Sequence, residues 1–309
     1  MSGTIDAAAG ILGSLASRDE PLGPRTTYRV GGAAALFVEI NNDAEIAAVG
    51  RAIAETAIEV VIVGKGSNML VADAGFAGLA VCLGDAFADV AIHGTTVRAG
   101  GAAALPVVAR RTVAAGLTGF EWAVGVPGSI GGAVRMNAGG HGSDMATCLI
   151  GVRVVDLRTG EDGAVSVPEL ELGYRQSTLS AHQLVVSADL QLSPGDPVAG
   201  AEMLADIVAW RRANQPGGPN AGSVFTNPPG DSAGRLIDSV GAKGMRVGSA
   251  CVSTKHANFI QADSGGSADD VHALMLQLID RVRAATGVVL RPETRLVGFH
   301  ENSQPQVEG

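Results

Sequence analysis

Clusters of glycine are the feature that most limits the folds open to this chain. The sequence has 309 residues, of which 43 are glycine, and eight of these fall within the 24 residues 119–142. Two further clusters, Gly31–Gly32 and Gly64–Gly66, lie next to segments that are predicted strands. Glycine permits positive φ and close approach to the backbone, so turns of this kind present N–H groups that can hold an anion. The clusters therefore predict a pyrophosphate cradle, with tight turns that bind nothing as the alternative.

The overall composition predicts a compact, aliphatic chain. Hydrophobic residues make up 46% of the sequence, charged residues 17% and aromatic residues 4%. A chain so poor in charge can bury enough surface to fold, which excludes disorder, and glycine follows no three-residue period, which excludes collagen. With a net charge of −9, the chain lacks the basic footprint of nonspecific nucleic-acid binding. We expect one or two domains and no nucleic-acid partner.

Cysteine and histidine usage bears on the compartment and on metals. The three cysteines, Cys82, Cys148 and Cys251, are far apart and form no C-x-x-C pair, as is typical of reduced thiols. The six histidines show no zinc-ligand spacing, so no metal site is expected. Residues 1–20 carry Asp6 and lack the basic leader of a signal peptide, and no run of 18 apolar residues could span a membrane. These features predict a cytoplasmic protein.

Hydrophobic periodicity predicts an α+β chain with many short strands rather than a regular βαβ array. Helices are expected at 44–56, 103–116, 200–213, 231–240 and 268–285, with an N-terminal helix that uses Ile11, Leu12 and Leu15. Strands are expected at 35–40, 58–63, 79–83, 88–92, 95–99, 149–157, 184–192, 257–261 and 289–298. The turn-rich text at 193–200 predicts a boundary between domains 1–195 and 196–309, and residues 301–309 are a predicted frayed tail.

The two common nucleotide-binding signatures do not fit the glycine clusters. A Rossmann fingerprint needs G-x-G-x-x-G at the start of a long helix, but Met69 occupies the third glycine position after Gly64 and Gly66. A P-loop needs G-x-x-x-x-G-K-[ST], and no segment of the chain matches it. A phosphate cradle in this chain therefore belongs to a different architecture.

Six segments, taken in order, resemble one enzyme family. They are VGKGSNMLVADAGFAGLAV, GFEWAVGVPGSIGGAVRMNAGGHG, GYRQSTL, NAGSVFTNP, LIDSVGAKGMRVGSACVSTKHANFI and LRPETRLVG. Together, over roughly residues 22–299, they resemble the UDP-N-acetylenolpyruvoylglucosamine reductases, flavoenzymes of bacterial cell-wall precursor synthesis. The resemblance implies an α+β fold, in which a flavin-binding domain of the vanillyl-alcohol-oxidase (PCMH) type precedes a smaller α+β substrate domain.

On this resemblance the glycine clusters hold FAD. The first loop would wrap the pyrophosphate through the backbone N–H groups of Gly64, Lys65, Gly66, Ser67 and Asn68. The remaining cofactor residues implied are Val126, Pro127, Gly128, Ser129, Gly131, Gly132, Asn137 and Ala138 in the cluster at 119–142, and Tyr28 and Arg29 before the strand expected at 35–40. Residues 63–70 contain no histidine that could tether a flavin, so we expect noncovalent FAD.

The resemblance also implies a reaction in two halves. NADPH reduces the flavin, and the reduced flavin passes a hydride to the enolpyruvyl double bond of UDP-N-acetylglucosamine enolpyruvate, which gives UDP-N-acetylmuramate for peptidoglycan. Ser223 matches the family's general acid, Arg175 the residue that binds the substrate carboxylate, and Glu293 the group that stabilises the enol or enolate. Taken singly, each has a plain structural alternative: a turn serine, a solvated arginine and an exposed strand glutamate.

A local excess of positive charge supports an anionic ligand. Residues 209–255 hold six basic and two acidic side chains, a net charge of +4 in a chain of net charge −9. Asn227 matches a substrate contact of the family, and Lys243 and Arg246 are candidate partners of a diphosphate. A solvated basic face is the alternative.

The chain departs from the family pattern in three places. Thr226 stands where lysine is commoner, and Gly140–His141 stand where an alanine–aromatic pair is commoner. The stretch between Arg175 and the helix expected at 200–213 is too short for the tyrosine-bearing loop of one subclass, which indicates the shorter subclass. Two other functions stay open: a noncatalytic UDP-sugar-binding protein and an oxygen-using flavin oxidase on the same fold. The intact set of three catalytic residues argues against the first.

Overall fold

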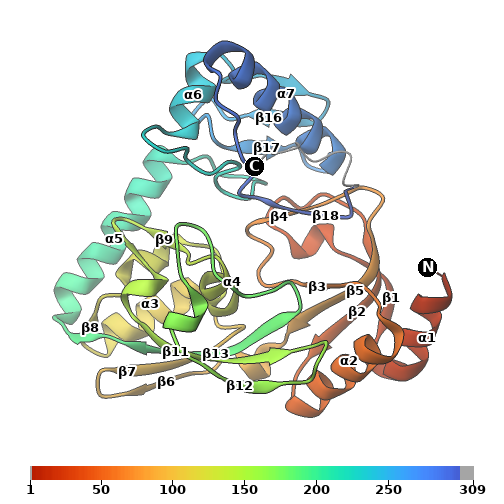
Figure 1. Cartoon of the computed structure of the whole chain (residues 1–309). Coiled ribbons are helices and arrows are strands. Elements are labelled where there is room, and N and C mark those ends of the chain that lie inside the picture. The colour runs from red at the N-terminus through yellow and green to blue at the C-terminus, as the bar shows by residue number, and fades with distance from the viewer. Residues whose placement is uncertain (1, 300–309) are drawn as a thin grey trace. The chain divides into compact units, whose positions relative to one another are not determined.

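The computed structural model describes residues 2–299, and contacts within the chain divide them into two compact units. Unit 1 takes the chain up to Arg18 together with Leu36–Lys65 and Gly78–Ala213. Unit 2 takes Asp19–Ala35, Gly66–Ala77 and the chain from Asn214 onward, so each unit is discontinuous in sequence (Figure 1). The division into domains 1–195 and 196–309 stays a prediction. The predicted tail at 301–309 lies outside the described residues.

Unit 1 contains a five-stranded antiparallel sheet in the order β12-β11-β13-β7-β6. Its strands are β6 (Val90–His93), β7 (Thr96–Gly100), β11 (Leu149–Asp156), β12 (Asp162–Val165) and β13 (Gln183–Gln191). Two helices, α3 (Leu105–Ala114) and α4 (Ile130–Arg135), share its core, and the long helix α5 (Pro197–Asn214) adds Ile207 to it. Two small ladders complete this part: β8 (Leu117–Thr118) with β14 (Ser193–Pro194), and β9 (Gly139–Gly140) with β10 (Ser143–Asp144).

A second sheet has the strand order β1-β2-β5-β3. Its strands are β1 (Ser17–Pro21), β2 (Ala33–Ile40), β5 (Phe76–Leu83) and β3 (Val60–Ile62), of which β3 and β5 run parallel. Helices α1 (Ser2–Leu12) and α2 (Asp43–Thr56) share a second core of unit 1 with the residues that β2, β3 and β5 contribute to that unit. The sequence sets the start of α2, because the Asn42 side chain accepts from the N–H of Glu45 (3.0 Å) and the Glu45 carboxylate accepts from the N–H of Asn41.

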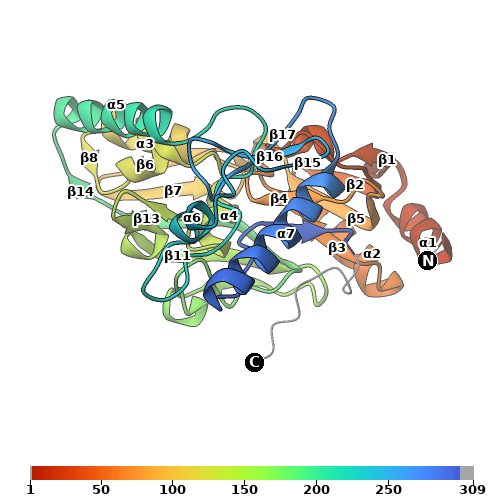
Figure 2. The same ribbon diagram turned by 90° about the horizontal axis from the view of Figure 1, so that it is seen from above.

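Unit 2 has its own core beneath a three-stranded antiparallel sheet and two helices. The sheet consists of β15 (Arg246–Val247), β16 (Ala250–Val252) and β17 (Ile260–Ala262), and α7 (Ala268–Thr286) packs against all three strands (Figures 1 and 2). The shorter α6 (Ala233–Ser239) contacts α7. A parallel ladder joins β4 (Met69–Val71) to β18 (Arg295–Val297) and pairs Met69 with Arg295, 226 residues later in the sequence. The loop after Gly66 is therefore anchored by a strand that lies close to the end of the described residues.

Most predicted elements are confirmed, and the misses have local reasons. All predicted helices are present, as α1, α2, α3, α5, α6 and α7. The strand predicted at 289–298 shrinks to β18; ahead of it Pro292 forms an isolated bridge with Phe225, and a proline has no N–H with which to extend that bridge into a ladder. The strand predicted at 257–261 begins only at Ile260, since the residues before it form a turn. Helix α4 was not predicted: its two glycines are poor helix formers, but the Ser129 hydroxyl caps its first turn.

None of the helices in residues 2–299 combines the length and the apolar composition of a membrane span. Nor do three or more His, Cys, Asp or Glu side chains gather in a metal-holding group anywhere in the part of the chain that the structure describes.

Candidate active site

The loop that follows β3 presents a row of free backbone N–H groups. The N–H groups of residues 64 and 65, in unit 1, and of residues 66–68, in unit 2, donate to no other group among residues 2–299. Consecutive N–H groups without an acceptor are the means by which a backbone turn binds a phosphate. The residues named from the sequence for the pyrophosphate therefore carry the donors that this ligand needs.

Gly66 can be no other residue without strain. It adopts φ +59°, and a Cβ there would lie 2.3 Å from the carbonyl oxygen of Arg25 and 2.6 Å from the Cα of Thr26. Its own carbonyl accepts a hydrogen bond of 3.1 Å from the N–H of Thr27. The loop is thus pressed against the 25–27 segment of unit 2, and this contact fixes the direction of the N–H groups beside it.

Within unit 1, the structure brings Gly64 against the glycine cluster at residues 119–142. A Cβ on Gly64 would lie only 2.8 Å from the hydroxyl oxygen of Ser129. Ser129 is buried, and its hydroxyl accepts from the N–H of Gly132 (3.4 Å) as the N-cap of α4. The loop after β3 and the start of α4 therefore meet where only a glycine fits.

In the glycine cluster at residues 119–142, some backbone N–H groups donate within the chain and others do not. The N–H of Gly131 donates to the carbonyl of Gly101 (2.9 Å), and the N–H of Val126 donates to that of Ala123 (3.1 Å). The N–H groups of Gly128 and Ser129 have no acceptor among the described residues. In this cluster, therefore, residues 128 and 129 have backbone donors left for an anion, and Val126 and Gly131 serve the fold.

Asn137 is fully engaged in unit 1. It adopts φ +38°, its Nδ2 donates to the carbonyl of Gly173 (3.0 Å) and to Asp144 (3.2 Å), and its Oδ1 accepts from the N–H of Ala146 (3.0 Å). The Gly173 carbonyl lies in the turn that carries Arg175. Asn137 therefore supports the turn of Arg175, while its neighbour Ala138 is partly buried.

Arg175 itself is partly buried and held from two sides. Its backbone adopts φ +58°, which is uncommon for a residue with a side chain. One guanidinium nitrogen, Nη2, donates to the carbonyl of Gly139 (3.3 Å), and the guanidinium lies 5.4 Å from the centroid of the Tyr174 ring. The strained turn and these contacts keep the charged group in one place, as the binding of a substrate carboxylate requires.

In unit 2, the structure brings Ser223, Glu293 and Asn68 together through the backbone. The residue after Ser223, Val224, accepts from the N–H of Glu293 (2.8 Å) with its carbonyl oxygen. The carbonyl of Glu293 in turn accepts from Nδ2 of Asn68 (3.0 Å), and the carbonyl of Asn68 accepts from the N–H of Arg295 (3.0 Å). Three residues named from separate motifs thus lie on one hydrogen-bonded framework, whereas Arg175 belongs to unit 1.

Tyr28 and Arg29 occupy different surroundings within unit 2. Tyr28 is fully buried in its core, and burial raises the pKa of its hydroxyl. Arg29 is exposed, at φ +57°, and its N–H donates to the hydroxyl of Thr26 (3.2 Å). Only Arg29 of this pair presents its side chain to solvent.

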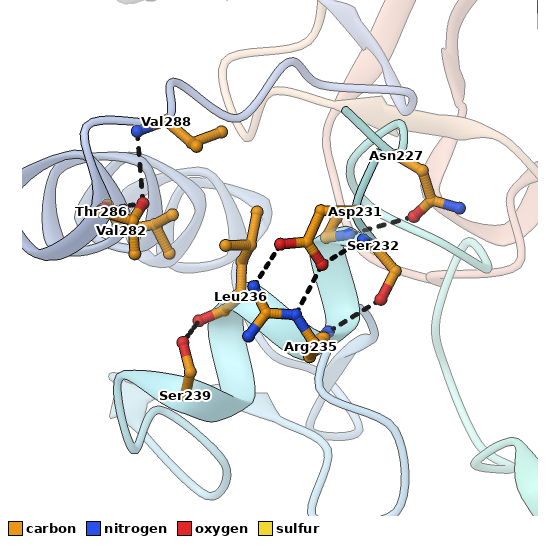
Figure 3. Close-up of polar contacts among 10 residues, drawn as sticks. Asn227, Asp231, Ser232, Arg235, Leu236, Ser239, Val282, Thr286 and Val288 are labelled. Carbon is orange, nitrogen blue, oxygen red and sulfur yellow. Dashed lines mark hydrogen bonds and ion pairs between the residues drawn. The ribbon is translucent and has the colours of Figure 1, made fainter. Parts of the chain in front are cut away.

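The basic side chains of unit 2 are largely neutralised. Lys243 donates to Asp238 (2.8 Å), and Arg246 pairs with Asp263, which lies outside the window counted in the sequence. Arg235 pairs with Asp231 and lowers the pKa of that carboxyl to about 2 (Figure 3). This arrangement favours a solvated face with ion pairs, and it weakens the argument from net charge for Lys243 and Arg246.

Asn227 and Thr226 follow the Ser223 segment. Oδ1 of Asn227 accepts from the N–H of Ala233 (3.0 Å) and so steadies the turn before α6, as Figure 3 shows. Thr226 stands where lysine is commoner, and both its N–H (3.0 Å) and its hydroxyl (3.3 Å) donate to the carbonyl of Arg291. A short polar side chain at 226 is therefore committed to the backbone and replaces the charge of a lysine with a structural bond.

One charged residue, which contacts the glycine cluster at residues 119–142, was not singled out from the sequence. In unit 1, a Cβ on Gly125 would lie 2.9 Å from Cδ of Arg211, so this arginine of α5 lies directly on a glycine. Burial lowers the pKa of Arg211, and no carboxylate pairs with it in the described part of the chain. The ring of Trp210, the residue before Arg211, contacts His141 edge-on with 5.1 Å between ring centroids, which shows what the unusual histidine packs against. In the sequence, nothing distinguishes Arg211 from its neighbour Arg212 on the same helix.

Comparisons with known proteins agree with these features. Residues 34–162 match a family model described as "FAD binding domain", and residues 213–297 match one described as "UDP-N-acetylenolpyruvoylglucosamine reductase, C-terminal domain". Among curated relatives, the reductase of that name from Heliobacterium modesticaldum is 42% identical over 94% of this chain and 93% of its own, and that from Anaeromyxobacter sp. is 44% identical over 92% and 89%.

A solved structure supports the same relationship. The crystal structure of UDP-N-acetylenolpyruvylglucosamine reductase from Thermus caldophilus is 34% identical, covers 90% of this chain and 97% of its own, and superposes with a TM-score of 0.77. These matches confirm the predicted fold class, a flavin-binding α+β domain followed by a smaller α+β domain.

Proposed function

The chain belongs to the UDP-N-acetylenolpyruvoylglucosamine reductase family, and from this premise we propose that Ser223, Arg175 and Glu293 perform its reaction beside FAD held by the glycine clusters. The enzyme reduces the enolpyruvyl group of UDP-N-acetylglucosamine enolpyruvate to give UDP-N-acetylmuramate, a peptidoglycan precursor. Its cofactor is FAD, and NADPH is the source of the hydride.

The residues present fit FAD. The free N–H groups of residues 64–68 and of Gly128 and Ser129 supply donors for a pyrophosphate. A side chain at Gly64 would collide with Ser129, and one at Gly66 with the backbone of residues 25 and 26, so the loop keeps this shape only with glycine at both positions. Bound there, FAD would supply the hydride chemistry between NADPH and the enolpyruvyl carbon. We assign Lys65, Ser67 and Asn68 to the same loop, and Tyr28, Arg29, Val126, Pro127, Gly131, Gly132, Asn137 and Ala138 to the shell around it. Within this shell, Asn137 and Gly131 act by shaping the backbone.

Ser223 is the proton donor in this proposal. A serine hydroxyl is a very weak acid, so it protonates a carbanion-like carbon only when it is held in line with that carbon. Gly222, at φ +76°, precedes it and donates its N–H to Oδ1 of Asn220 (3.0 Å). Val224 follows it and bonds to the Glu293 backbone. The hydroxyl is therefore mounted between two fixed neighbours.

Arg175 and Glu293 handle the charge that develops on the substrate. The planar guanidinium of Arg175 can hold the substrate carboxylate with two parallel hydrogen bonds, which keeps the enolpyruvyl group from rotating. Glu293 hydrogen-bonds at the same centre and stabilises the enol form while Ser223 gives up its proton. The observation that carries the pairing of Ser223 with Glu293 is the hydrogen bond from the Glu293 N–H to the carbonyl of Val224, the residue after Ser223.

Further parts of the proposal concern the surroundings. We assign domain 1–195 to flavin binding and domain 196–309 to substrate binding. We assign Asn227, Lys243 and Arg246 to substrate contacts, for which Lys243 and Arg246 exchange their aspartate partners for a diphosphate. The three free cysteines support a cytoplasmic location, and the acidic chain supports the absence of a nucleic-acid partner. The short connection between Arg175 and α5 supports the subclass without the tyrosine loop.

The test is the visible spectrum of the purified protein through one catalytic cycle. We expect a yellow protein that is bleached by NADPH without oxygen and whose colour returns on addition of the enolpyruvyl nucleotide sugar. Colour that returns only with air would point to the oxygen-using oxidase. A protein that binds the nucleotide sugar but takes up no FAD would be the noncatalytic binding protein, and either result would overturn the proposal.

A further inference from the structure

One buried amide side chain holds the Ser223 segment in place. Asn258 is 3% exposed, and its side chain pairs with both backbone groups of Phe225. Oδ1 accepts from the N–H of Phe225 (3.0 Å), and Nδ2 donates to the carbonyl of the same residue (2.8 Å). The amide therefore takes the place of a peptide group on a neighbouring strand.

The backbone of Asn258 adds to this grip. Its carbonyl accepts from the N–H of Val224 (2.9 Å), so two successive residues after Ser223 are bound to a single asparagine. Its N–H donates to Nδ1 of His256 (3.3 Å), which fixes the asparagine itself. Pro292 bridges Phe225 on the other edge, but β17 begins only at Ile260, so among the described residues no strand pairs with the edge of Phe225 that faces Asn258. The amide supplies the pairing there that a strand would give.

The opposite edge of the same segment carries Glu293. Val224 accepts from the N–H groups of Glu293 (2.8 Å) and Thr294 (3.3 Å). The segment 224–225 thus lies between Asn258 on one edge and Glu293 on the other, and its position across that gap is set by bonds to both. A shift of the segment toward either edge changes the separation of Ser223 from Glu293.

We propose that Asn258 is a positioning residue that fixes the proton donor Ser223 relative to Glu293, an inference that rests on the proposed function. Asn258 does not touch the reacting atoms in this proposal. A buried amide with both ends bonded holds its partner rigidly, and losing one end leaves a backbone group of Phe225 unpaired. Displacement of a proton donor by about 1 Å can cost about 100-fold in rate.

The decisive variant is Asn258→Asp, which keeps the size of the side chain. Its carboxylate can still accept from the N–H of Phe225, but it cannot donate to the carbonyl, so the segment loses one of its two side-chain bonds. In stopped-flow experiments on the holoenzyme, we expect flavin reduction by NADPH to stay within about twofold of wild type. Reoxidation by the enolpyruvyl nucleotide sugar should slow by about 10- to 100-fold, with the KM for the nucleotide sugar nearly unchanged.

A matched control and a second variant separate positioning from folding. Gln261→Ala removes another amide of unit 2 that donates to a loop carbonyl, that of Gly217 (2.8 Å), and both half-reactions should match wild type. Asn258→Ser, which retains one short hydroxyl, should show the same selective loss if Asn258→Asp does not fold. Thermal unfolding and flavin content are measured on each protein.

The outcomes are distinct. A selective loss in reoxidation supports the positioning role. Parallel loss of both half-reactions, loss of flavin, or no change in either would overturn it, because the amide would then be structural or dispensable. If wild-type reduced enzyme does not respond to the nucleotide sugar, the proposed function fails and the inference with it, a result that is read before any variant is made.

Discussion

A serine can act as an acid only through its position, and this makes Ser223 the sharpest test at the scale of single residues. In Ser223→Ala, flavin reduction by NADPH should be unchanged, because no proton from this residue is needed there. Reoxidation by the enolpyruvyl nucleotide sugar should fall by several orders of magnitude, as expected for loss of a group used only in that step. Stopped-flow absorbance of the flavin measures both.

Ser239→Ala is the control for this substitution. Ser239 lies in the same unit, at the end of α6, where its hydroxyl donates to the carbonyl of Leu236 (2.7 Å, Figure 3). Both half-reactions should stay at wild-type rates. Equal slowing of both steps in Ser223→Ala would make Ser223 a residue of folding or of cofactor binding.

Gly66 offers a test of the cradle against a glycine of nearly the same conformation. Gly66 has φ +59° and a crowded Cβ position, whereas Gly94 has φ +61° and nothing within 4 Å of that position. Alanine at either costs about 1 kcal/mol for the positive φ, but only Gly66→Ala adds a clash with the backbone. We expect purified Gly66→Ala to lose most of its flavin absorbance and Gly94→Ala to keep it. Full flavin in both variants would contradict the cradle.

His256 links acidity to stability. Burial, followed by the nearby Lys243, lowers its pKa below the usual value of about 6.5. Because the unfolded chain then binds a proton more readily than the folded one, stability is full above about pH 6.5 and falls as the pH drops through the folded pKa. Urea midpoints between pH 8 and pH 5 should decline more steeply in wild type than in His256→Gln. The same pH dependence in both proteins would show that His256 does not contribute to it.

Sequence reasoning at the residue scale located the framework but not its supports. Asn68, Ser223 and Glu293 were named from motifs. In the structure the Asn68 side chain donates to the carbonyl of Glu293, and the N–H of Glu293 donates to the carbonyl of Val224, the neighbour of Ser223. Asn258 and Arg211 were missed, because an asparagine in a turn and one arginine of a pair carry no pattern of their own. Their importance arises from contacts with Phe225 and Gly125, which lie 33 and 86 residues away in sequence.

At the scale of elements, α7 is capped by a residue from a distant loop. Oδ1 of Asp73, which follows β4, accepts from the N–H of Ala268 (2.9 Å), and its Oδ2 accepts from the N–H of Asp269 (3.2 Å). The local cap is Ser267, whose hydroxyl accepts from the N–H of Asp270 (3.1 Å). A carboxylate at the positive end of a helix of 19 residues stabilises it through these bonds and through the helix dipole.

Asp73→Ala should therefore lower the free energy of unfolding by about 1–2 kcal/mol. Asp73→Asn, which keeps an acceptor but not the charge, should cost less. Asp280→Ala is the control, since Asp280 is exposed and pairs with Arg283 on the surface of α7. Chemical denaturation with flavin present compares the three, and an effect of Asp73→Ala no larger than that of the control would exclude a distant cap.

Elements were predictable where periodicity was long. Helices α2 and α7 have clear apolar stripes and their own caps at Asn42 and Ser267, so both were placed to within one or two residues. The six residues of α4 were not, because IGGAVR has no stripe and only its packing against β13 and its Ser129 cap make it helical. The turn that carries Arg175 likewise depends on Asn137, from another segment.

For the whole molecule, the binding of FAD should be reversible and should stabilise the fold. Residues 63–70 carry no histidine for a covalent link, and the proposed cradle consists of backbone N–H groups. Denaturation should release all of the flavin into the filtrate. Apoprotein refolded with FAD should gain about 2.7 kcal/mol at a concentration of 100 times Kd, seen as a rise in Tm. FMN, which lacks the second phosphate, should give a smaller rise, and flavin that stays with the denatured chain would contradict this prediction.

Charge at the scale of the molecule was the least reliable guide from the sequence. Counting residues 209–255 gave an excess of positive charge, but Asp263, eight positions beyond that window, neutralises Arg246. A window in sequence does not follow a surface in space. The order of motifs along the chain identified the family, whereas the discontinuous composition of the two units could be seen only in the fold.

That discontinuity governs when the core of unit 2 can form during synthesis. Tyr28, Val30 and Leu70 belong to the core that α7 and β16 complete, yet they leave the ribosome some 200 residues earlier. At about 5–20 residues per second, these side chains wait on the order of ten seconds or more for their partners. A gene fragment that begins at residue 213, where the C-terminal family match begins, would encode a core that lacks all three. Unit 2 is therefore not a separable module, because its core is assembled from three separate segments of the chain.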